Sequence, residues 1–449
     1  MAEAPAPDAG LRRAISGRML IVFIVGDILG AGIYALVGKL AGQVGGTVWL
    51  PLAIGFVVAA LTAASYAELV GKYPRAAGAA LYAHRAFKRP FLTFLIAFAV
   101  MMSGIASASA AALAFGGNYL AQFISAPPML AALGFLAMIT LINFIGISES
   151  IKVNLVLTIV EVTGLVIVIV VGVIGIAQGT GEPSRVLEMT APNGAVLGVL
   201  GATALGFYAL IGFEDSVNLA EECEEPHRTF PVALFLGITI TGVIYLAVSF
   251  IAVVLVPPAT LATSSGPLLE VVNAAGVQFP PKLFAIIALL AIGNTALINM
   301  IMASRLLYGM ANENIVPRAF GRVHATRNTP VVAIGFTVVI SCALIASGTV
   351  RDLAETTVLL LLLVFAIVNI AVLVLKRRPV EHPHFTTPRW APVLGAITTL
   401  VLASPLSGRA PRVYLVAGIL VGVGAVLWGL NRLITGTKVT EIDAENLVK

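Results

Sequence analysis

Long apolar segments separated by short polar ones recur along the chain from Met19 to Leu433. Each is close to the ~20 residues that an α-helix needs to cross the hydrocarbon core of a bilayer, and we count about twelve of them. We predict membrane-spanning helices at Ser16–Val44, Val48–Val70, Pro90–Phe123, Met129–Ile147, Ile151–Ile176, Ala195–Glu222, Pro231–Val256, Lys282–Met310, Pro330–Ala346, Thr356–Leu375, Ala391–Ser404 and Arg412–Ile434. The first and sixth are longer than one crossing requires, and the eleventh is short enough to be either a thin crossing or a re-entrant segment. The pattern predicts an all-α membrane protein with most of its chain inside lipid.

The basic residues between these segments fall mainly on one side of the predicted membrane. If successive loops alternate sides, the lysines and arginines divide about four to one, and the positive-inside rule places the richer side in the cytoplasm. Both chain ends are then expected in the cytoplasm, with the protein in the plasma (inner) membrane and an even number of spans. The residues before the first span contain no basic region leading into a cleavable apolar segment, so we expect no signal peptide.

Composition and charge narrow the class of protein further. Of the 449 residues, 59% are hydrophobic and 11% are charged, against about 25% charged in soluble domains, so a water-soluble fold is excluded. The pI is near 9.3 because basic residues are concentrated in the short loops between spans. They form no single surface suited to binding nucleic acid. Cys223 and Cys342 are too few and too far apart for a disulfide framework or a metal cluster. We expect both cysteines to be reduced, and we expect no metal or other cofactor.

Two of the predicted helices are interrupted near their middle by glycine and acidic residues. The first contains Gly26–Ile33 (GDILGAGI) and the sixth contains Gly206–Asp215 (GFYALIGFED). Glycine costs about 1 kcal/mol at a helical position in water. Unpaired backbone in lipid costs more, so irregular backbone at this depth has to line a cavity. An unwound turn exposes N–H groups at the start of one half-helix and carbonyl groups at the end of the other, which together match an α-carboxylate and an α-ammonium group.

The two interruptions lie five spans apart. This spacing is expected for an inverted repeat of five plus five helices, with the ligand site where the repeats meet. The alternative reading is that Gly30 and Gly32 only allow neighbouring helices to pack closely, as small residues do in membranes. Because two such glycine clusters stand at corresponding positions of the two repeats, we favour a ligand-binding site over close helix packing alone.

Several short motifs, in order, resemble those of one transporter superfamily. They are Gly30–Ile33 in the first span, Glu68 with Tyr73–Gly78 after the second, Ile211–Glu214 through Glu221–Glu222 and Pro226–Arg228 around the sixth, and Ala303–Arg305 leading to Asn314–Pro317. Their order and spacing resemble the amino acid–polyamine–organocation (APC) superfamily from Leu11 to about Ile434, and its cationic-amino-acid-transporter-like bacterial permeases look closest. The resemblance implies a leucine-transporter-like APC fold: an inverted-repeat core (helices 1–5 and 6–10) over 16–376, two trailing helices over 377–434, and cytoplasmic tails at 1–15 and 435–449.

The resemblance also implies which residues form the substrate site. The first span would contribute Asp27, Ile28, Gly30, Ala31 and Gly32, and the sixth Tyr208, Ile211 and Gly212, with Tyr208 as an aromatic gate. Gly104, Ile105 and Ser109 of the third span and Asn299 of the eighth would shape the side-chain pocket. We expect no catalytic residues.

The acidic residues predicted at membrane depth are Asp27, Glu161, Glu214 and Asp215. Burying a carboxylate at this depth costs free energy, so we expect these residues to have a function. Glu214 is expected either to link protonation to gate movement or to stabilise the dipole of the following half-helix. Glu161 stands where proton-coupled relatives carry a lysine, so it is a titrating proton carrier, a ligand for a cation, or the partner of a neighbouring helix. A second set of charged residues lies near the cytoplasmic face. We expect these residues either to form ion pairs that close an inner gate or to satisfy helix ends: Glu68, Glu221, Glu222, Arg228 and Arg305.

These features predict a secondary active transporter that carries amino acids across the membrane by alternating access. The chain has no GxxxxGK[ST] loop for an ATP-driven pump and no nucleophile–base pair or metal cluster in its spans for an enzyme. Proton-coupled uptake is the first expectation, with sodium as the alternative ion. Exchange of amino acids or polyamines, and a non-transporting amino acid sensor, are the alternative functions. Neutral or cationic amino acids fit better than polyamines, which lack the carboxylate, and the oligomeric state stays open.

Overall fold

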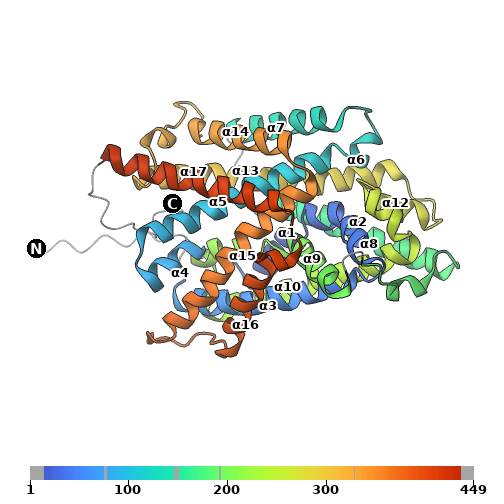
Figure 1. Cartoon of the computed structure of the whole chain (residues 1–449), viewed down its shortest axis with the longest axis horizontal. Helices are drawn as coiled ribbons and strands as arrows, with labels where there is room; N and C mark the ends of the chain where they lie inside the picture. Colours follow the sequence, from blue (N-terminus) through green and yellow to red (C-terminus); the bar gives the residue numbers. More distant parts are fainter. Residues whose placement is uncertain (1–14, 75–77, 146–150, 192–193, 328, 436–449) are drawn as a thin grey trace, which may run out of the picture.

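The computed structural model describes residues 15–74, 78–145, 151–191, 194–327 and 329–435, and this part of the chain is a bundle of helices (Figure 1). The α-helices are α1 (Gly17–Ile28), α2 (Ala31–Val44), α3 (Trp49–Lys72), α4 (Gly78–Phe87), α5 (Pro90–Phe115), α6 (Asn118–Ala121), α7 (Pro128–Ile145), α8 (Ile151–Ala177), α9 (Ala195–Gly206), α10 (Pro226–Leu255), α11 (Pro258–Thr263), α12 (Pro267–Ala274), α13 (Pro281–Asn312), α14 (Val331–Ser347), α15 (Val350–Leu375), α16 (Trp390–Ala403) and α17 (Pro411–Thr435). Short 3-10 segments are η1 (Pro183–Leu187), η2 (Phe207–Leu210), η3 (Asp215–Glu222), η4 (Arg318–Gly321) and η5 (Pro405–Ser407). The predicted all-α fold is confirmed.

The membrane-spanning segments follow the predicted order. Nine helical segments in the described residues are long and apolar enough to cross a membrane, and α1 with α2 makes one further span that bends by 43°. The shorter apolar helices α14 and α16 occupy the positions of the ninth and eleventh predicted spans. At 17 and 14 residues they fall below the ~20 residues of a full crossing, so their crossing stays a prediction.

Proline and polar side chains set several helix starts. α5, α10 and α13 each have proline in the first turn, where its missing N–H group costs nothing. α15 starts with a capping box, in which the Thr349 hydroxyl accepts the Asp352 N–H and the Asp352 carboxylate accepts the Thr349 N–H, both at 3.2 Å. These caps explain why the apolar runs begin where they do.

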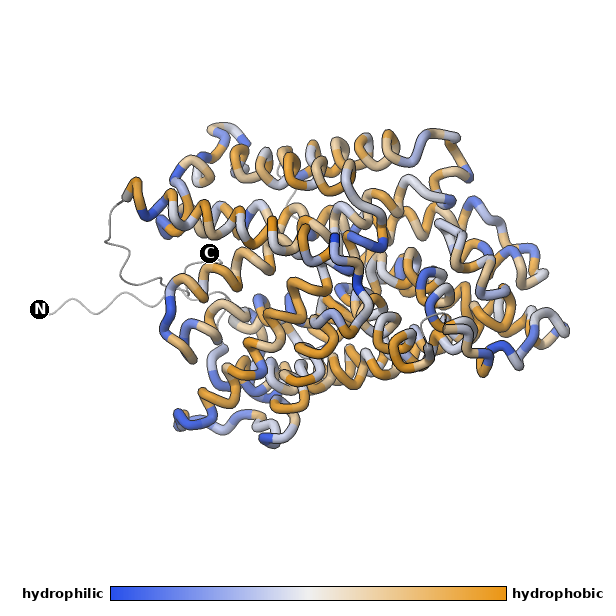
Figure 2. The backbone as a smooth tube through the Cα atoms, in the orientation of Figure 1, coloured by the Kyte–Doolittle hydropathy of each residue, from blue (hydrophilic) through white to orange (hydrophobic). Residues whose placement is uncertain are grey.

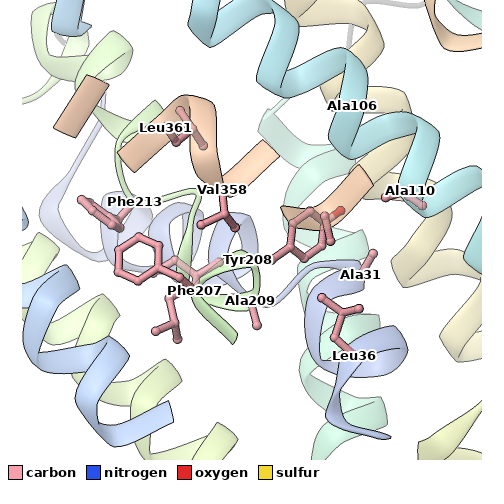
Figure 3. Close-up of a cluster of buried hydrophobic side chains, with 14 of the residues drawn as sticks. Ala31, Leu36, Ala106, Ala110, Phe207, Tyr208, Ala209, Phe213, Val358 and Leu361 are labelled. Atoms are coloured by element: carbon pink, nitrogen blue, oxygen red, sulfur yellow. The ribbon is translucent and has the colours of Figure 1, made fainter. Parts of the chain in front are cut away.

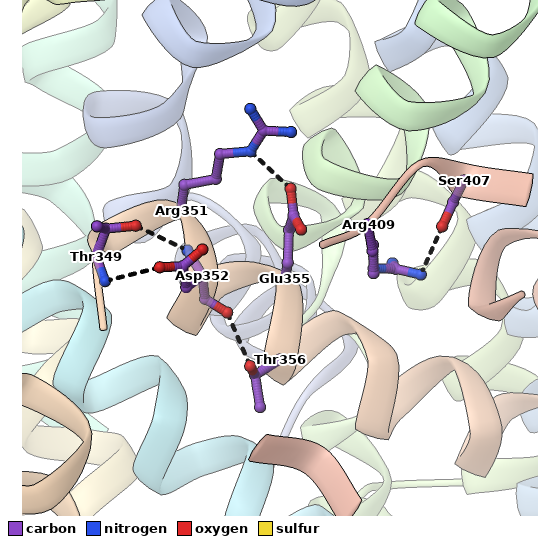
Figure 4. A network of polar contacts seen from close by, with 7 residues as sticks. All are labelled: Thr349, Arg351, Asp352, Glu355, Thr356, Ser407 and Arg409. Carbon is purple, nitrogen blue, oxygen red and sulfur yellow. Dashed lines mark hydrogen bonds and ion pairs between the residues drawn. The ribbon is translucent and has the colours of Figure 1, made fainter. Parts of the chain in front are cut away.

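A polar network surrounds the start of α15 (Figure 4). Arg351 binds the buried carboxylate of Glu355 at 2.8 Å. Arg409, in the turn between α16 and α17, is 6% exposed and donates to the Leu402 carbonyl and the Ser407 hydroxyl. Burial lowers the pKa of Arg409, and the nearby Glu355 opposes that shift. The Arg409 bonds join the end of α16 to the turn before α17, and the negative charge of Glu355 on α15 lies close enough to interact with Arg409.

The packing places α5 at the centre of the molecule. It lies against α13 and α15, while α10 packs on α3 and α1. α4 and α12 lie at opposite ends of the bundle in Figure 1, and we name the two ends of the molecule after them. Large apolar side chains are exposed along the peripheral helices α7, α8 and α17, and Figure 2 shows the apolar residues following the helices with polar residues at the turns. This distribution suits a protein whose sides face lipid.

Some elements differ from the prediction. α10 starts at Pro226 rather than Pro231, and α4, α11 and α12 lie in segments expected to be loops, because a window of twenty apolar residues does not detect short amphipathic helices. The second half of the sixth span is η3, which starts afresh because Gly212 leaves the helical region with φ +121°. The tail residues 1–14 and 436–449 and the motif residues 75–77 lie outside the described residues.

Candidate functional site

The first helix break separates α1 from α2 at Leu29 and Gly30. α2 has Gly30 as its N-cap, which supplies no capping side chain. Instead, the Thr295 hydroxyl of α13 accepts the Ala31 N–H at 2.9 Å. At the other side of the break, the Tyr245 hydroxyl of α10 donates to the Ile28 carbonyl at 2.7 Å. Two neighbouring helices therefore satisfy backbone groups that an unwound turn leaves open.

The second break follows α9. After η2, Ile211 is extended and Gly212 has a positive φ, which a residue with a Cβ rarely adopts. The Glu214 carboxylate accepts the Gly212 N–H at 2.8 Å, so this acid caps its own loop. A Cβ on Gly212 would lie 2.6 Å from the Asp27 carbonyl oxygen, so only glycine allows the two breaks to touch at this point.

A cavity of about 780 Å³ lies at the meeting point of the two breaks. Its walls come from α1, α2, α5, η2, α13 and α15, and it extends toward the α4 end, where Gly78 and Arg305 line it. Figure 3 shows Phe207 and Phe213 on one side of η2 and Tyr208 on the other side, toward α5. The Tyr208 hydroxyl lies 3.0 Å from that of Ser107 on α5, which closes this wall.

Most residues predicted for the site line this one cavity. They are Asp27, Ile28, Gly30, Ala31, Gly32, Gly104, Tyr208, Ile211, Gly212, Asn299, Glu214 and Asp215. Lining the cavity does not test their roles, which stay predictions. The three carboxyl groups and Arg305 are the charged groups among the lining residues in the described part of the chain. The start of α2 adds the partial positive charge of a helix N-terminus.

Ser109 and Ile105 do not line the cavity. Both are fully buried in α5, and Ser109 donates to the Ile105 carbonyl one turn earlier at 2.7 Å. At 3.6 residues per turn, a residue five positions after Gly104 points about 140° away from it, whereas Ser107 returns to the same face. The placement of Ser109 in the pocket is therefore corrected to Ser107.

Sequence reasoning missed several polar residues of the cavity wall, and Ser107 and Thr295 are two of them. Thr295 lies four residues before Asn299, and the Asn299 side-chain amide donates to the Thr295 carbonyl at 2.9 Å. An i, i+4 pair of polar residues inside an apolar span was the available signal. Ser107, three residues after Gly104, was detectable by the same periodicity.

Glu161 lies apart from the cavity, on α8. Its side chain is among the most buried carboxyl groups, with 1% of the residue exposed. The side-chain amide of Asn294 on α13 donates to its Oε1 at 3.2 Å, and the Tyr34 hydroxyl of α2 donates to its backbone carbonyl at 2.9 Å. The residue therefore has the neighbouring-helix partner that one of its expected roles required.

The charged residues at the α4 end pair differently from the predicted inner gate. Glu68 binds Lys376 at 2.5 Å, and Arg228 lies 3.9 Å from Glu225 on the surface. Lys72 donates to the Leu375 carbonyl at 2.5 Å, so helix ends are satisfied here. The side chain of Glu221 lies outside the described part. In that part, no group of three or more histidine, cysteine or acidic residues could hold a metal ion.

Fold and cavity together define a polytopic α-helical membrane protein with a central cavity at two broken helices. The family model described as amino acid permease matches residues 15–433. The chain is 30% identical over 429 residues to an uncharacterised transporter of Mycobacterium tuberculosis, covering 95% of this chain and 92% of that protein. It is 25% identical over 418 residues to the branched-chain amino acid permease BcaP of Bacillus subtilis (88% and 87% covered) and 29% identical over 391 residues to the vacuolar cationic amino acid transporter 4 of Arabidopsis thaliana (82% and 64%). The chain belongs to the amino acid permease family, which confirms the resemblance to APC transporters.

Proposed function

We propose that the protein is a secondary active transporter that takes up amino acids across the plasma membrane by alternating access, coupled to protons. The observation that carries this proposal is that one cavity meets both helix breaks. Its volume of about 780 Å³ suits a small molecule, for which sites of roughly 300–1,000 Å³ are usual. Membership of the amino acid permease family supports an amino acid as the substrate.

The substrate backbone is held between the two partial charges of the first break. Its carboxylate lies at the start of α2, against the amides of Gly30 and Gly32, while the ammonium group faces the carbonyl end of α1 and the carboxyl group of Asp27. Its side chain points toward Gly104 of α5 and Asn299 of α13, where the two helices approach closely. Tyr208 covers the substrate and moves during the cycle.

Glu161 carries the coupling proton. A buried carboxylate inside a membrane protein is costly, and gaining a proton removes that cost. Its hydrogen bond to Asn294 joins it to α13, the helix whose next residue, Thr295, caps α2 at the cavity. Sodium remains the alternative ion, because a carboxylate and an amide oxygen are also cation ligands.

The α4 end of the molecule faces the cytoplasm. Arg18, Lys88, Arg89 and Arg228 lie at helix starts or turns of this end, whereas Arg185, Lys282 and Arg351 belong to the α12 end. The positive-inside rule supports this orientation, with both chain termini in the cytoplasm. Because the cavity extends toward α4, this conformation gives access from the cytoplasmic side.

The test is uptake into liposomes that contain the purified protein. Radiolabelled leucine, alanine, serine, arginine, lysine and putrescine are offered under an inward proton gradient, with empty and preloaded vesicles compared and protein-free vesicles as the control. Concentrative uptake of an amino acid into empty vesicles, lost with a protonophore, is the expected result. Uptake only into preloaded vesicles identifies an exchanger, and binding without flux identifies a sensor. Either result rejects proton-coupled uptake.

A further inference from the structure

One turn of α13 contacts both the buried carboxyl group and the substrate cavity. Asn294 donates to Glu161 Oε1 at 3.2 Å on one side. The next residue, Thr295, accepts the Ala31 N–H at 2.9 Å on the other side. The Thr295 carbonyl also accepts the side-chain amide of Asn299 at 2.9 Å, and Asn299 lines the cavity. Thr295 thus holds the start of α2 and orients a cavity residue through two separate atoms.

The fit between Thr295 and the first helix break is specific. A Cβ at Gly30 would collide with the Thr295 hydroxyl, so glycine at this position and the hydroxyl of Thr295 are complementary. α2 has no capping side chain from its own segment. The first-turn N–H groups of a helix need a partner, and here the partner stands 264 positions away in the sequence. Movement of α13 at Thr295 therefore has to move the start of α2.

Asn294 is suited to respond to a proton on Glu161. A charged carboxylate only accepts hydrogen bonds, and it receives one from the Asn294 amide. A protonated carboxyl group donates, and Asn294 Oδ1 is a buried acceptor with no hydrogen-bond partner within the described residues. Rotating the amide by about 180° exchanges its donor for its acceptor. The Glu161–Asn294 pair therefore has two bonded arrangements, one for each protonation state.

We propose that Thr295 is a positioning residue that couples the protonation of Glu161 to the substrate cavity. This inference rests on the proposed proton-coupled transport. The change between the two arrangements of the Glu161–Asn294 bond shifts the adjacent Thr295, whose hydroxyl and carbonyl pass the shift to Ala31 and Asn299. Proton binding and substrate binding then favour the same position of this turn, and by linkage each strengthens the other by the same factor.

Other ionisable groups near Glu161 could also contribute to the pH dependence of KM. α8 packs against α1, α10, α12 and α13. Tyr34 of α2 and Tyr245 of α10 interact with Glu161. Asp27 is the acidic residue of α1, and Glu270 is the acidic residue of α12. α13 has no charged residue between Lys282 and Arg305. Tyrosines stay neutral between pH 5.5 and 8, and Asp27 belongs to the substrate site, so a Thr295 variant that leaves Asp27 in place tests the link to Glu161.

The experiment compares Thr295→Val, which removes the hydroxyl at nearly constant volume, with Thr295→Ser, which keeps it. KM and kcat are measured in proteoliposomes at pH 5.5 and pH 8 with whichever of leucine, alanine, serine, arginine and lysine the wild type takes up fastest. Thr337→Val is the control, because Thr337 is a buried threonine of the neighbouring helix α14 whose hydroxyl donates within its own helix at 2.8 Å. Thr295→Ala replaces Thr295→Val if that variant fails to fold.

In the wild type, KM is expected to fall as the pH is lowered. Thr295→Val loses the hydrogen bond from the Ala31 N–H and also the longer bond from its hydroxyl to the Ala291 carbonyl of its own helix. Only the first joins two helices, and one such bond is worth about fivefold in an equilibrium constant, so the ratio of KM values between pH 8 and pH 5.5 is expected to drop by about fivefold. Thr295→Ser restores the ratio and Thr337→Val leaves it unchanged. A wild-type ratio kept by Thr295→Val overturns the role of Thr295 alone. If the KM of the wild type is the same at pH 5.5 and pH 8, both the proposed proton coupling and this inference are overturned.

Discussion

Replacing Glu68 by glutamine is expected to destabilise the protein by about 3 kcal/mol. Glu68 is 2% exposed at the end of α3, and its Oε2 accepts the Lys376 ammonium at 2.5 Å and the Thr387 N–H at 2.8 Å. Removing the negative charge leaves the ammonium group without its counter-charge, and breaking a buried pair costs roughly 3–5 kcal/mol. We use the lower limit because Lys376 keeps its bond to the Thr387 carbonyl, at 2.6 Å.

The assay is thermal unfolding of purified protein in detergent, followed by intrinsic fluorescence. At roughly 2 °C per kcal/mol for a long chain, Glu68→Gln is expected to lower Tm by about 6 °C. Arg228→Gln is the control, because its pair with Glu225 spans 3.9 Å and both side chains are more than half exposed. Such a surface pair is worth about 0–1 kcal/mol.

A double variant separates the charge effect from packing. Glu68→Gln combined with Lys376→Met removes both members of the pair, and removing both is less costly than leaving one buried charge alone. The double variant is therefore expected to recover part of the Tm that Glu68→Gln loses. Equal Tm shifts in Glu68→Gln and Arg228→Gln, or a further loss in the double variant, would refute the assignment of a stabilising buried pair.

Three further outcomes are expected. Gly212→Ala is expected to abolish uptake per molecule of protein, because a Cβ at this position would enter the first helix break. Gly422→Ala is the control and leaves uptake normal, because a Cβ at Gly422 meets no other atom. Equal activities of the two variants would contradict the contact between the breaks. Tyr208→Phe removes the hydroxyl that bonds to the Ser107 hydroxyl and carbonyl, and is expected to raise KM about fivefold, the net worth of one hydrogen bond. An unchanged KM would argue against a wall at this position. Burial raises the pKa of Cys223 to about 12, so its thiol stays protonated at pH 8 and a charged maleimide labels it only after unfolding; rapid labelling of native Cys342→Ser protein would disprove its burial.

The fold class and the position of the cavity could be predicted from the sequence. Apolar segments of membrane length require backbone groups to bond within each segment, which restricts them to helices. Gly30 and Gly212 stand where the helices break, because glycine and neighbouring acids disfavour a continuous apolar helix. The faces of the helices were harder to predict, since Ser109 and Ser107 differ only by a rotation within α5.

The partners of the polar groups were decided by the tertiary structure alone. Thr295 caps Ala31 and Lys376 binds Glu68, each across more than 260 positions of the sequence. Within an apolar span, local pattern fixes that a segment is helical and roughly which residues share a face. It carries no information on which distant helix brings the matching donor or acceptor. That choice depends on how the helices pack, where a buried polar group has to find a partner among the side chains that packing places beside it.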